Sequence, residues 1–88
     1  MSIRLRLDKP WQPLDAETAK RLPGQLGVYQ VADSGGTVLY IGQAGARSPF
    51  GLRSELEREF RERGAGCQFR VEVNQQYRSR WFELLMVH

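Results

Sequence analysis

The sequence predicts a small α/β fold, in which a mainly antiparallel three-stranded sheet is flanked by helices. Three segments have the composition of strands and two have helical periodicity. In chain order, the predicted elements are strands at 27–32, 37–42 and 67–73 and helices at 50–63 and 77–88. The first two strands are joined by an Asp- and Gly-rich turn at 33–36, which predicts a β-hairpin. Packing the apolar stripe of a helix against one face of the sheet buries the apolar side chains of both. We therefore expect helices to be layered on the sheet.

Length and composition indicate one small domain, residues 1–88. A chain of 88 residues buries roughly 60% of the surface that its unfolded form exposes. Its net charge is +3, with Arg supplying 11 of 13 cations, which permits nucleic-acid binding without requiring it. No apolar run reaches the ~20 residues of a membrane span and no signal-peptide core precedes the domain, so we expect a cytoplasmic protein. The single cysteine, Cys67, excludes an internal disulfide.

The N-terminal region predicts a strand followed by a short helix. Ser2 to Leu7 alternates apolar residues with Arg, and a proline-containing segment at 10–13 then forms a stiff connector. Asp15 has the position and chemistry of a helix N-cap. Pro23 and Gly24 should end that helix after about two turns.

The hairpin register should place two tyrosines side by side. If 33–36 forms the loop, Ala32 pairs with Thr37 and Tyr29 lies opposite Tyr40. Directly opposed residues point to the same face of a sheet, so the two phenols would be neighbours.

The helix at 50–63 has one apolar stripe, formed by Leu52, Leu56 and Phe60. The other residues alternate in charge, which indicates a solvated, self-neutralised face. The expected ion pairs at helical spacing are Glu57 with Arg61, Glu59 with Arg63, and Arg58 with Glu62.

Glu83 is the only polar side chain from Trp81 to Val87. A carboxylate on so apolar a helix must reach the surface, pair with a cation such as Arg80 or Arg47, or bind a metal, because burying it alone is costly. This helix has no C-cap signal, so we expect either a truncated C-terminus or a partner that covers this end.

Two triplets in the hairpin carry a family resemblance. Gly27-Val28-Tyr29 and Tyr40-Ile41-Gly42 resemble the signature of the GIY-YIG nuclease family, with Val in place of Ile in the first triplet. The preceding segment at 22–26 is similar to the lead-in of DNA-repair nucleases in that family. The resemblance covers residues 22–88.

This resemblance implies a metal-dependent endonuclease that hydrolyses a phosphodiester bond in DNA. It implies that Tyr29 and Tyr40 position or activate water, that Arg53 binds phosphate and that Glu83 holds one Mg²⁺ or Mn²⁺ ion. Mg²⁺ keeps several waters and often rests on one or two carboxylates, so a single Glu suffices. Which tyrosine activates the water stays open, with a preference for Tyr40 beside the Gly42 loop.

The arginine is where the sequence departs from the family. The register that usually carries the functional arginine holds Glu55 here. Arg53 is the nearest replacement, Arg47 and Arg58 are weaker ones, and loss of this arginine is a further alternative. The terminal His88 is expected to be solvated.

Three functions therefore stay open. The first is the DNA endonuclease, with specificity supplied by a partner, an additional segment or dimerisation. The second is a catalytically silent domain that serves as a nucleic-acid or protein interaction module, which Glu55 favours. The third is a KH-like RNA binder, because 41–45 matches the Ile-Gly-x-x-Gly loop, and it requires a helix before Gly42.

Overall fold

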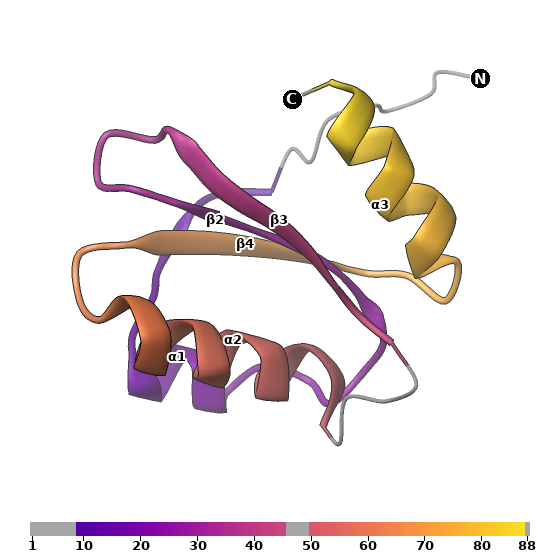
Figure 1. Ribbon diagram of the computed structural model, residues 1–88. Coiled ribbons are helices and arrows are strands. Elements are labelled where there is room, and N and C mark those ends of the chain that lie inside the picture. The colour runs from indigo at the N-terminus through magenta and orange to yellow at the C-terminus, as the bar shows by residue number, and fades with distance from the viewer. Residues whose placement is uncertain (1–8, 46–49, 88) are drawn as a thin grey trace.

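The computed structural model describes residues 9–45 and 50–87. Its elements are β1 (Gln12–Pro13), α1 (Ala16–Lys20), β2 (Gly27–Ala32), β3 (Val38–Ala44), α2 (Gly51–Arg63), β4 (Gln68–Val73) and α3 (Tyr77–Met86). The predicted α/β class is confirmed (Figure 1). The strand expected at 2–7 lies outside the described residues.

The sheet has four antiparallel strands in the order β1-β4-β2-β3. The expectation of three strands is wrong, because the connector at 10–13 contributes β1. Gln12 pairs with Phe69 and Pro13 with Gln68 at the sheet edge. An edge strand tolerates proline because its outward side needs no N–H donor.

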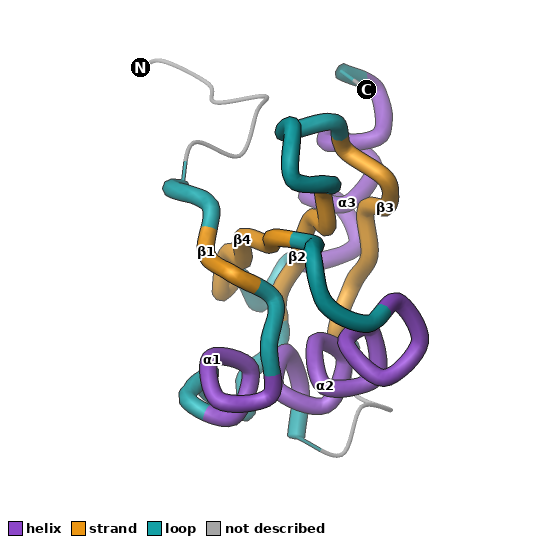
Figure 2. Tube along the Cα trace, turned by 90° about the vertical axis from the view of Figure 1, so that its left-hand side faces the viewer, coloured by secondary structure: helices purple, strands orange, loops and turns teal. Residues whose placement is uncertain are grey.

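The two faces of the sheet are covered by different helices. In Figures 1 and 2, α1 and α2 lie on one side of the sheet and α3 lies on the other. Side chains alternate between faces along a strand, so Tyr29 and Val31 join the cluster under α1 and α2. Val28 on the same strand instead packs with Ile41 and Leu84 under α3. All six residues of β2 are buried, and this strand separates the two small cores.

The hairpin register differs from the expected one by two residues. Tyr29 pairs with Gly42, and Tyr40 pairs with Val31. A shift of two residues preserves the face of every side chain, whereas a shift of one would invert it. The two tyrosines therefore share a face as expected, although they are diagonal neighbours rather than a directly opposed pair.

The shift has two parts of one residue each: Ala32 pairs with Val38 rather than with Thr37, and a β-bulge adds one more residue. Val31 pairs with Tyr40 while Ala32 pairs with Val38, which leaves Leu39 as an extra residue on β3. A bulge cannot be read from turn residues alone, so the sequence did not reveal it.

The short helix α1 begins where the sequence indicated. Asp15 is its N-cap, and its side chain accepts a hydrogen bond of 2.7 Å from the backbone N–H of Thr18. The helix ends at Lys20, before the expected stop at Pro23. Leu14, Ala19 and Leu22 are buried against α2 and the sheet, which holds so short a helix in place.

The glycines of the two hairpin triplets are required by close packing. A Cβ at Gly27 would overlap the backbone carbonyl oxygen of Glu72, and a Cβ at Gly42 would overlap the ring of Tyr29. Backbone cannot move aside as a flexible side chain can. Gly27 therefore allows β2 and β4 to approach, and Gly42 provides the space for the tyrosine ring.

Replacing Gly27 with Ala should destabilise the domain by about 3 kcal/mol or more, because the added methyl group overlaps backbone of the central strand pair. Urea unfolding followed by circular dichroism measures this loss. Gly35→Ala is the matched control, since a Cβ there meets only Asp33 Oδ1, at 3.5 Å. Equal stabilities for the two variants would contradict the packing explanation.

Candidate functional site

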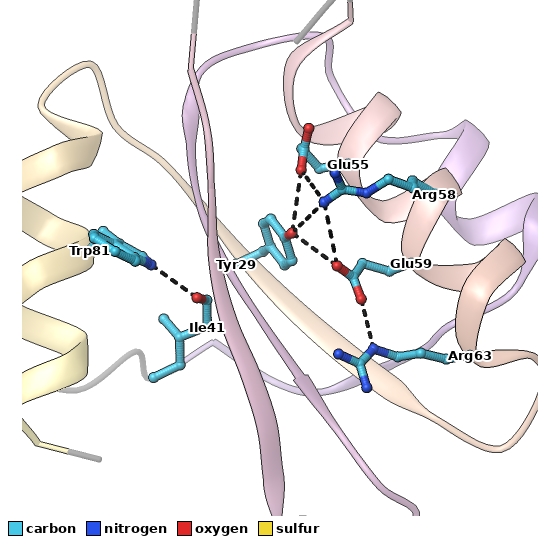
Figure 3. A network of polar contacts seen from close by, with 7 residues as sticks. All are labelled: Tyr29, Ile41, Glu55, Arg58, Glu59, Arg63 and Trp81. Atoms are coloured by element: carbon cyan, nitrogen blue, oxygen red, sulfur yellow. Dashed lines mark hydrogen bonds and ion pairs between the residues drawn. The ribbon is translucent and has the colours of Figure 1, made fainter. Parts of the chain in front are cut away.

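The candidate site is centred on the phenol of Tyr29, in the middle of β2. The side chain is fully buried (0% exposed), and its hydroxyl group lies against α2 (Figure 3). Carboxylate oxygens of Glu59 and Glu55 lie 3.2 and 3.4 Å from the hydroxyl oxygen, within donation distance. Arg58 Nη2 donates to the same oxygen over 3.4 Å. The phenol is therefore enclosed by charged groups of one helix.

Those charged groups also pair with one another. Arg58 Nη2 lies 2.7 Å from Glu55 Oε1 and 3.6 Å from Glu59 Oε2. Arg63 Nε donates to Glu59 Oε1 over 2.7 Å. Glu59 is only 3% exposed, so its charge depends on these partners. We call Tyr29, Glu55, Arg58, Glu59 and Arg63 the tyrosine network.

The position of these acids follows from helix geometry. Glu55 and Glu59 lie three and seven residues after the buried Leu52, so they share its face of the helix. The expectation of a fully solvated charged face is therefore wrong for these two residues. The predicted Glu59–Arg63 pair is confirmed, whereas Arg58 pairs with Glu55 and Glu59 rather than with Glu62.

The environment of Tyr29 keeps its phenol protonated. Burial raises the pKa of Tyr29 far above its ordinary value, and the carboxylates of Glu59 and Glu55 raise it further. A general base must be able to lose its proton near neutral pH. In this network the neutral phenol is the favoured form, and it serves as a hydrogen-bonding group.

Tyr40 is the accessible partner of this site. Its ring centroid lies 6.0 Å from that of Tyr29, and 42% of the residue is exposed. The guanidinium of Arg63 lies 5.7 Å from the Tyr40 ring centroid, in a cation–π arrangement. The expected neighbourhood of Tyr29 and Tyr40 is confirmed.

Arg53 does not belong to this site. Its Nε donates to the carbonyl oxygen of Leu22 over 2.9 Å, and its guanidinium lies over the Phe50 ring. Arg53 therefore links α2 to the end of α1. Arg53, which the sequence favoured as the phosphate-binding arginine, therefore does not lie beside the tyrosines, whereas Arg58 contacts Tyr29 and Arg63 contacts Tyr40. Arg47 lies outside the described residues.

Glu83 lies on the other side of the sheet. It belongs to α3, which packs on the face of Val28 and Ile41, whereas Tyr29 and Tyr40 face α2. Its carboxylate accepts from Arg80 Nη1 over 3.1 Å. The joint site of Glu83 with Tyr29 and Tyr40 that the family resemblance implied is therefore not formed, and the pairing of Glu83 with Arg80 is one of the alternatives expected from the sequence.

The single Mg²⁺ or Mn²⁺ ion expected at Glu83 stays a prediction, because an ion that keeps several waters can rest on one carboxylate. Within 9–45 and 50–87, no group of three or more His, Cys, Asp or Glu could hold an ion together. Glu55 and Glu59 are near each other, but the guanidinium of Arg58 lies between their oxygens. A metal ion between Glu55 and Glu59 would first have to displace the guanidinium of Arg58. Glu83 lies on the opposite face of the sheet and could not be a further ligand of that ion.

The opposite face carries a second set of polar contacts that the sequence did not indicate. Buried Gln30 accepts from Arg70 Nε over 2.7 Å, and the Arg70 guanidinium stacks on Trp11 at 4.1 Å. The indole N–H of Trp81 donates to the carbonyl oxygen of Ile41 over 2.9 Å. This last bond attaches α3 to β3 (Figure 3).

The KH-like alternative is also excluded by the fold. The segment before Gly42 is strand β3, whereas a KH loop follows a helix. No helix in the described part of the chain is long and apolar enough to cross a membrane.

Comparison with protein families gives one match. Residues 5–88 match the model of a domain of unknown function, DUF7508. Comparison with curated proteins and with solved structures gave no match. The assignment to the GIY-YIG nuclease family is therefore wrong: the model that covers nearly the whole chain describes a different family, so the two triplets are a local similarity.

Tyr29→Phe should lower the free energy of unfolding by about 1–3 kcal/mol at pH 7, because it removes a buried hydroxyl group that contacts charged partners. Urea unfolding measures the loss. Tyr77→Phe is the matched control, since no hydrogen bond of its hydroxyl group is found within the described residues, and it should cost less than about 0.5 kcal/mol. Equal losses would contradict the role of the network.

The stabilisation from Tyr29 should also disappear in alkali. Its pKa in the folded state lies above the unfolded value of 10.0, so the contribution is complete below pH 10 and is lost as pH rises beyond it. The stability difference between wild type and Tyr29→Phe should therefore stay constant from pH 7 to about pH 9 and shrink above about pH 10. A difference that grows between pH 7 and pH 9, or that does not shrink above about pH 10, would show that the folded phenol ionises at least as easily as the unfolded one.

Proposed function

The chain belongs to the DUF7508 family, and from the geometry of its own residues we propose that the domain is a catalytically silent protein-interaction module. The observation that carries this proposal is the tyrosine network. Its two glutamates and two arginines neutralise one another around a phenol that stays protonated. The two carboxylates and two guanidinium groups have no net charge together, so the network offers little electrostatic attraction to a phosphate.

The arginines favour a protein partner over nucleic acid. A nucleic-acid surface needs cations whose charge is available to phosphates. Several arginines instead donate to groups of their own chain: Arg53, Arg58, Arg63, Arg70 and Arg80. These five arginines form contacts that stabilise the fold. They therefore do not form a basic stripe, although the net charge of the chain is +3.

The exposed apolar residues support a protein partner directly. Large apolar side chains are exposed on β3, on α3 and at the ends of neighbouring elements: Leu39, Tyr40, Phe50, Val73, Phe82, Leu85 and Met86. Exposed aromatic residues and Met are enriched at protein–protein contact sites.

A metal-dependent DNA endonuclease is the competing proposal. It is favoured by the nearness of Tyr29 to Tyr40 and by the exposure of Tyr40 and Arg58, at 42% and 44%. It requires Glu55 and Glu59 to release Arg58 when DNA and Mg²⁺ or Mn²⁺ bind. A cytoplasmic location stays a prediction under either proposal.

The two proposals are separated by a nicking assay on supercoiled plasmid DNA with Mg²⁺ or Mn²⁺. The silent module predicts no nicking above a protein-free control, for wild type and for Glu83→Gln alike. Glu83→Gln should change stability only slightly, because Arg80 keeps its 2.9 Å bond to Glu72.

An authentic metal-dependent endonuclease in parallel reactions shows that the conditions support cleavage. Wild-type nicking that requires the metal and is abolished by Tyr40→Phe or Arg58→Ala would overturn the silent module and favour the endonuclease. Nicking that persists unchanged in those variants would indicate a contaminant, which a repeat purification identifies.

A further inference from the structure

Strand β3 forms one edge of the sheet, and its composition does not protect that edge. It pairs with β2 on one side and has no further strand on the other among the described residues. An edge strand presents unpaired backbone N–H and C=O groups that can bind a strand of another chain, and charged residues, proline or a short length usually prevent this. The opposite edge, β1, has two residues and contains Pro13. The seven residues of β3 include no charge and no proline.

The hairpin determines which backbone groups of β3 point outward. The backbone N–H of Asp33 donates to the carbonyl oxygen of Thr37 over 3.0 Å, so these two residues form a hydrogen-bonded pair. Hydrogen-bonded and non-hydrogen-bonded pairs alternate along antiparallel strands. Gln30 and Ile41 are the third pair after this one, counted through the bulge, and are therefore a non-hydrogen-bonded pair. The N–H and C=O groups of Ile41, the middle residue of β3, thus point away from β2.

Trp81 of α3 occupies the outward position beside Ile41. Its indole Nε1 donates to the carbonyl oxygen of Ile41 over 2.9 Å (Figure 3). A further strand of the sheet would place a backbone N–H at a similar distance from that oxygen, and its backbone would lie about 4.8 Å from β3. The indole ring and a further strand therefore compete for the same oxygen and for the same space.

One turn of α3 runs along this edge. A Cβ at Gly45, the residue after β3, would lie 2.9 Å from the hydroxyl oxygen of Tyr77. Trp81 lies about one helical turn after Tyr77, and it contacts Ile41, which precedes Gly45 in the chain. The helix and the strand therefore lie side by side over this length (Figure 1). At the other end of β3, the bulge at Leu39 disrupts the regular ladder.

Contacts with the other strands hold α3 in this position. Its N-cap residue makes no side-chain hydrogen bond and its first turn has no acidic residue, so the helix depends on its packing against the sheet. Leu84 packs with Val28 of β2, and Arg80 Nε donates to Glu72 of β4 over 2.9 Å. These two contacts hold the helix across the sheet and keep Trp81 at the edge.

We propose that α3 is a built-in cover of the β3 edge, and that Trp81 keeps β3 from pairing with a strand of another chain. The cover lies on the opposite face of the sheet from the tyrosine network. It therefore operates whether or not the domain is catalytically silent.

Sedimentation velocity of the whole chain from about 1 to 500 µM tests this proposal. Wild type should stay monomeric. Trp81→Phe keeps an aromatic ring in the apolar contact but removes the indole N–H, and the smaller ring leaves the carbonyl oxygen of Ile41 open. This variant should form oligomers at about 50 µM or below, a concentration at least about tenfold lower than wild type requires. Trp81 is half-buried, so the variant should fold, as circular dichroism and thermal unfolding will show.

A second substitution, Gln43→Lys, distinguishes pairing through β3 from general loss of stability. Gln43 belongs to the next non-hydrogen-bonded pair, with Val28, so its backbone also points outward. Two copies paired through β3 would bring the added charges together, and a charge on an edge strand opposes pairing. The double variant Trp81→Phe/Gln43→Lys should therefore be monomeric again.

Trp11→Phe is the matched control, because it makes the same change at a tryptophan that stacks on Arg70 and should leave the chain monomeric. A folded Trp81→Phe variant that stays monomeric to about 500 µM would overturn the proposal. Oligomers that persist in the double variant, or that form equally with Trp11→Phe, would also overturn it, because they would not arise from the opened β3 edge.

Discussion

The burial of the Tyr29 phenol against α2 is the constraint on which the rest of the structure depends. A hydroxyl group taken out of water must find hydrogen-bond partners or lose several kcal/mol. Glu59 and Glu55 supply them, and their charges in turn require Arg58 and Arg63. These contacts act together with the apolar stripe of Leu52 and Leu56 to hold α2 on the sheet.

The same constraint explains the hairpin triplets. The Tyr29 ring lies against Gly42, where any side chain would overlap it, and Gly27 lets β4 approach β2. Tyr29, Gly42 and Gly27 are therefore accounted for by packing alone. A short pattern of tyrosines and glycines can arise from a tightly packed hairpin, which is why the local similarity to a nuclease signature did not identify the family.

The sequence was sufficient to predict what depends on local pattern. The hairpin, the apolar stripe of α2, the N-cap at Asp15 and the helical C-terminal segment were all predicted. Interactions between distant segments were not. The pairing of 12–13 with β4 leaves no local signal, and the bulge at Leu39 depends on how two strands fit. The sequence also does not indicate which face of the sheet α3 covers after β4. Glu83 could therefore be assigned to a helix, but its position relative to the tyrosines could not be predicted.

The roles of the acids could have been found by extending one rule. Glu55 and Glu59 share the face of Leu52 at helical spacing, which marks them as candidates for burial with partners rather than for solvation. Because both residues are charged, they were expected to lie on the solvent-exposed face of α2. Acidic residues that continue an apolar helix stripe can be buried if a tyrosine on the facing strand donates a hydrogen bond to them.

The most direct test of this account is a double-mutant cycle between Tyr29→Phe and Glu59→Gln, with free energies of unfolding measured in urea. A structural network predicts that the two losses are strongly non-additive, with a coupling of about 1 kcal/mol or more, because each variant removes the same contact. A coupling near zero would contradict the account, since it would mean that the phenol and the carboxylate stabilise the fold independently.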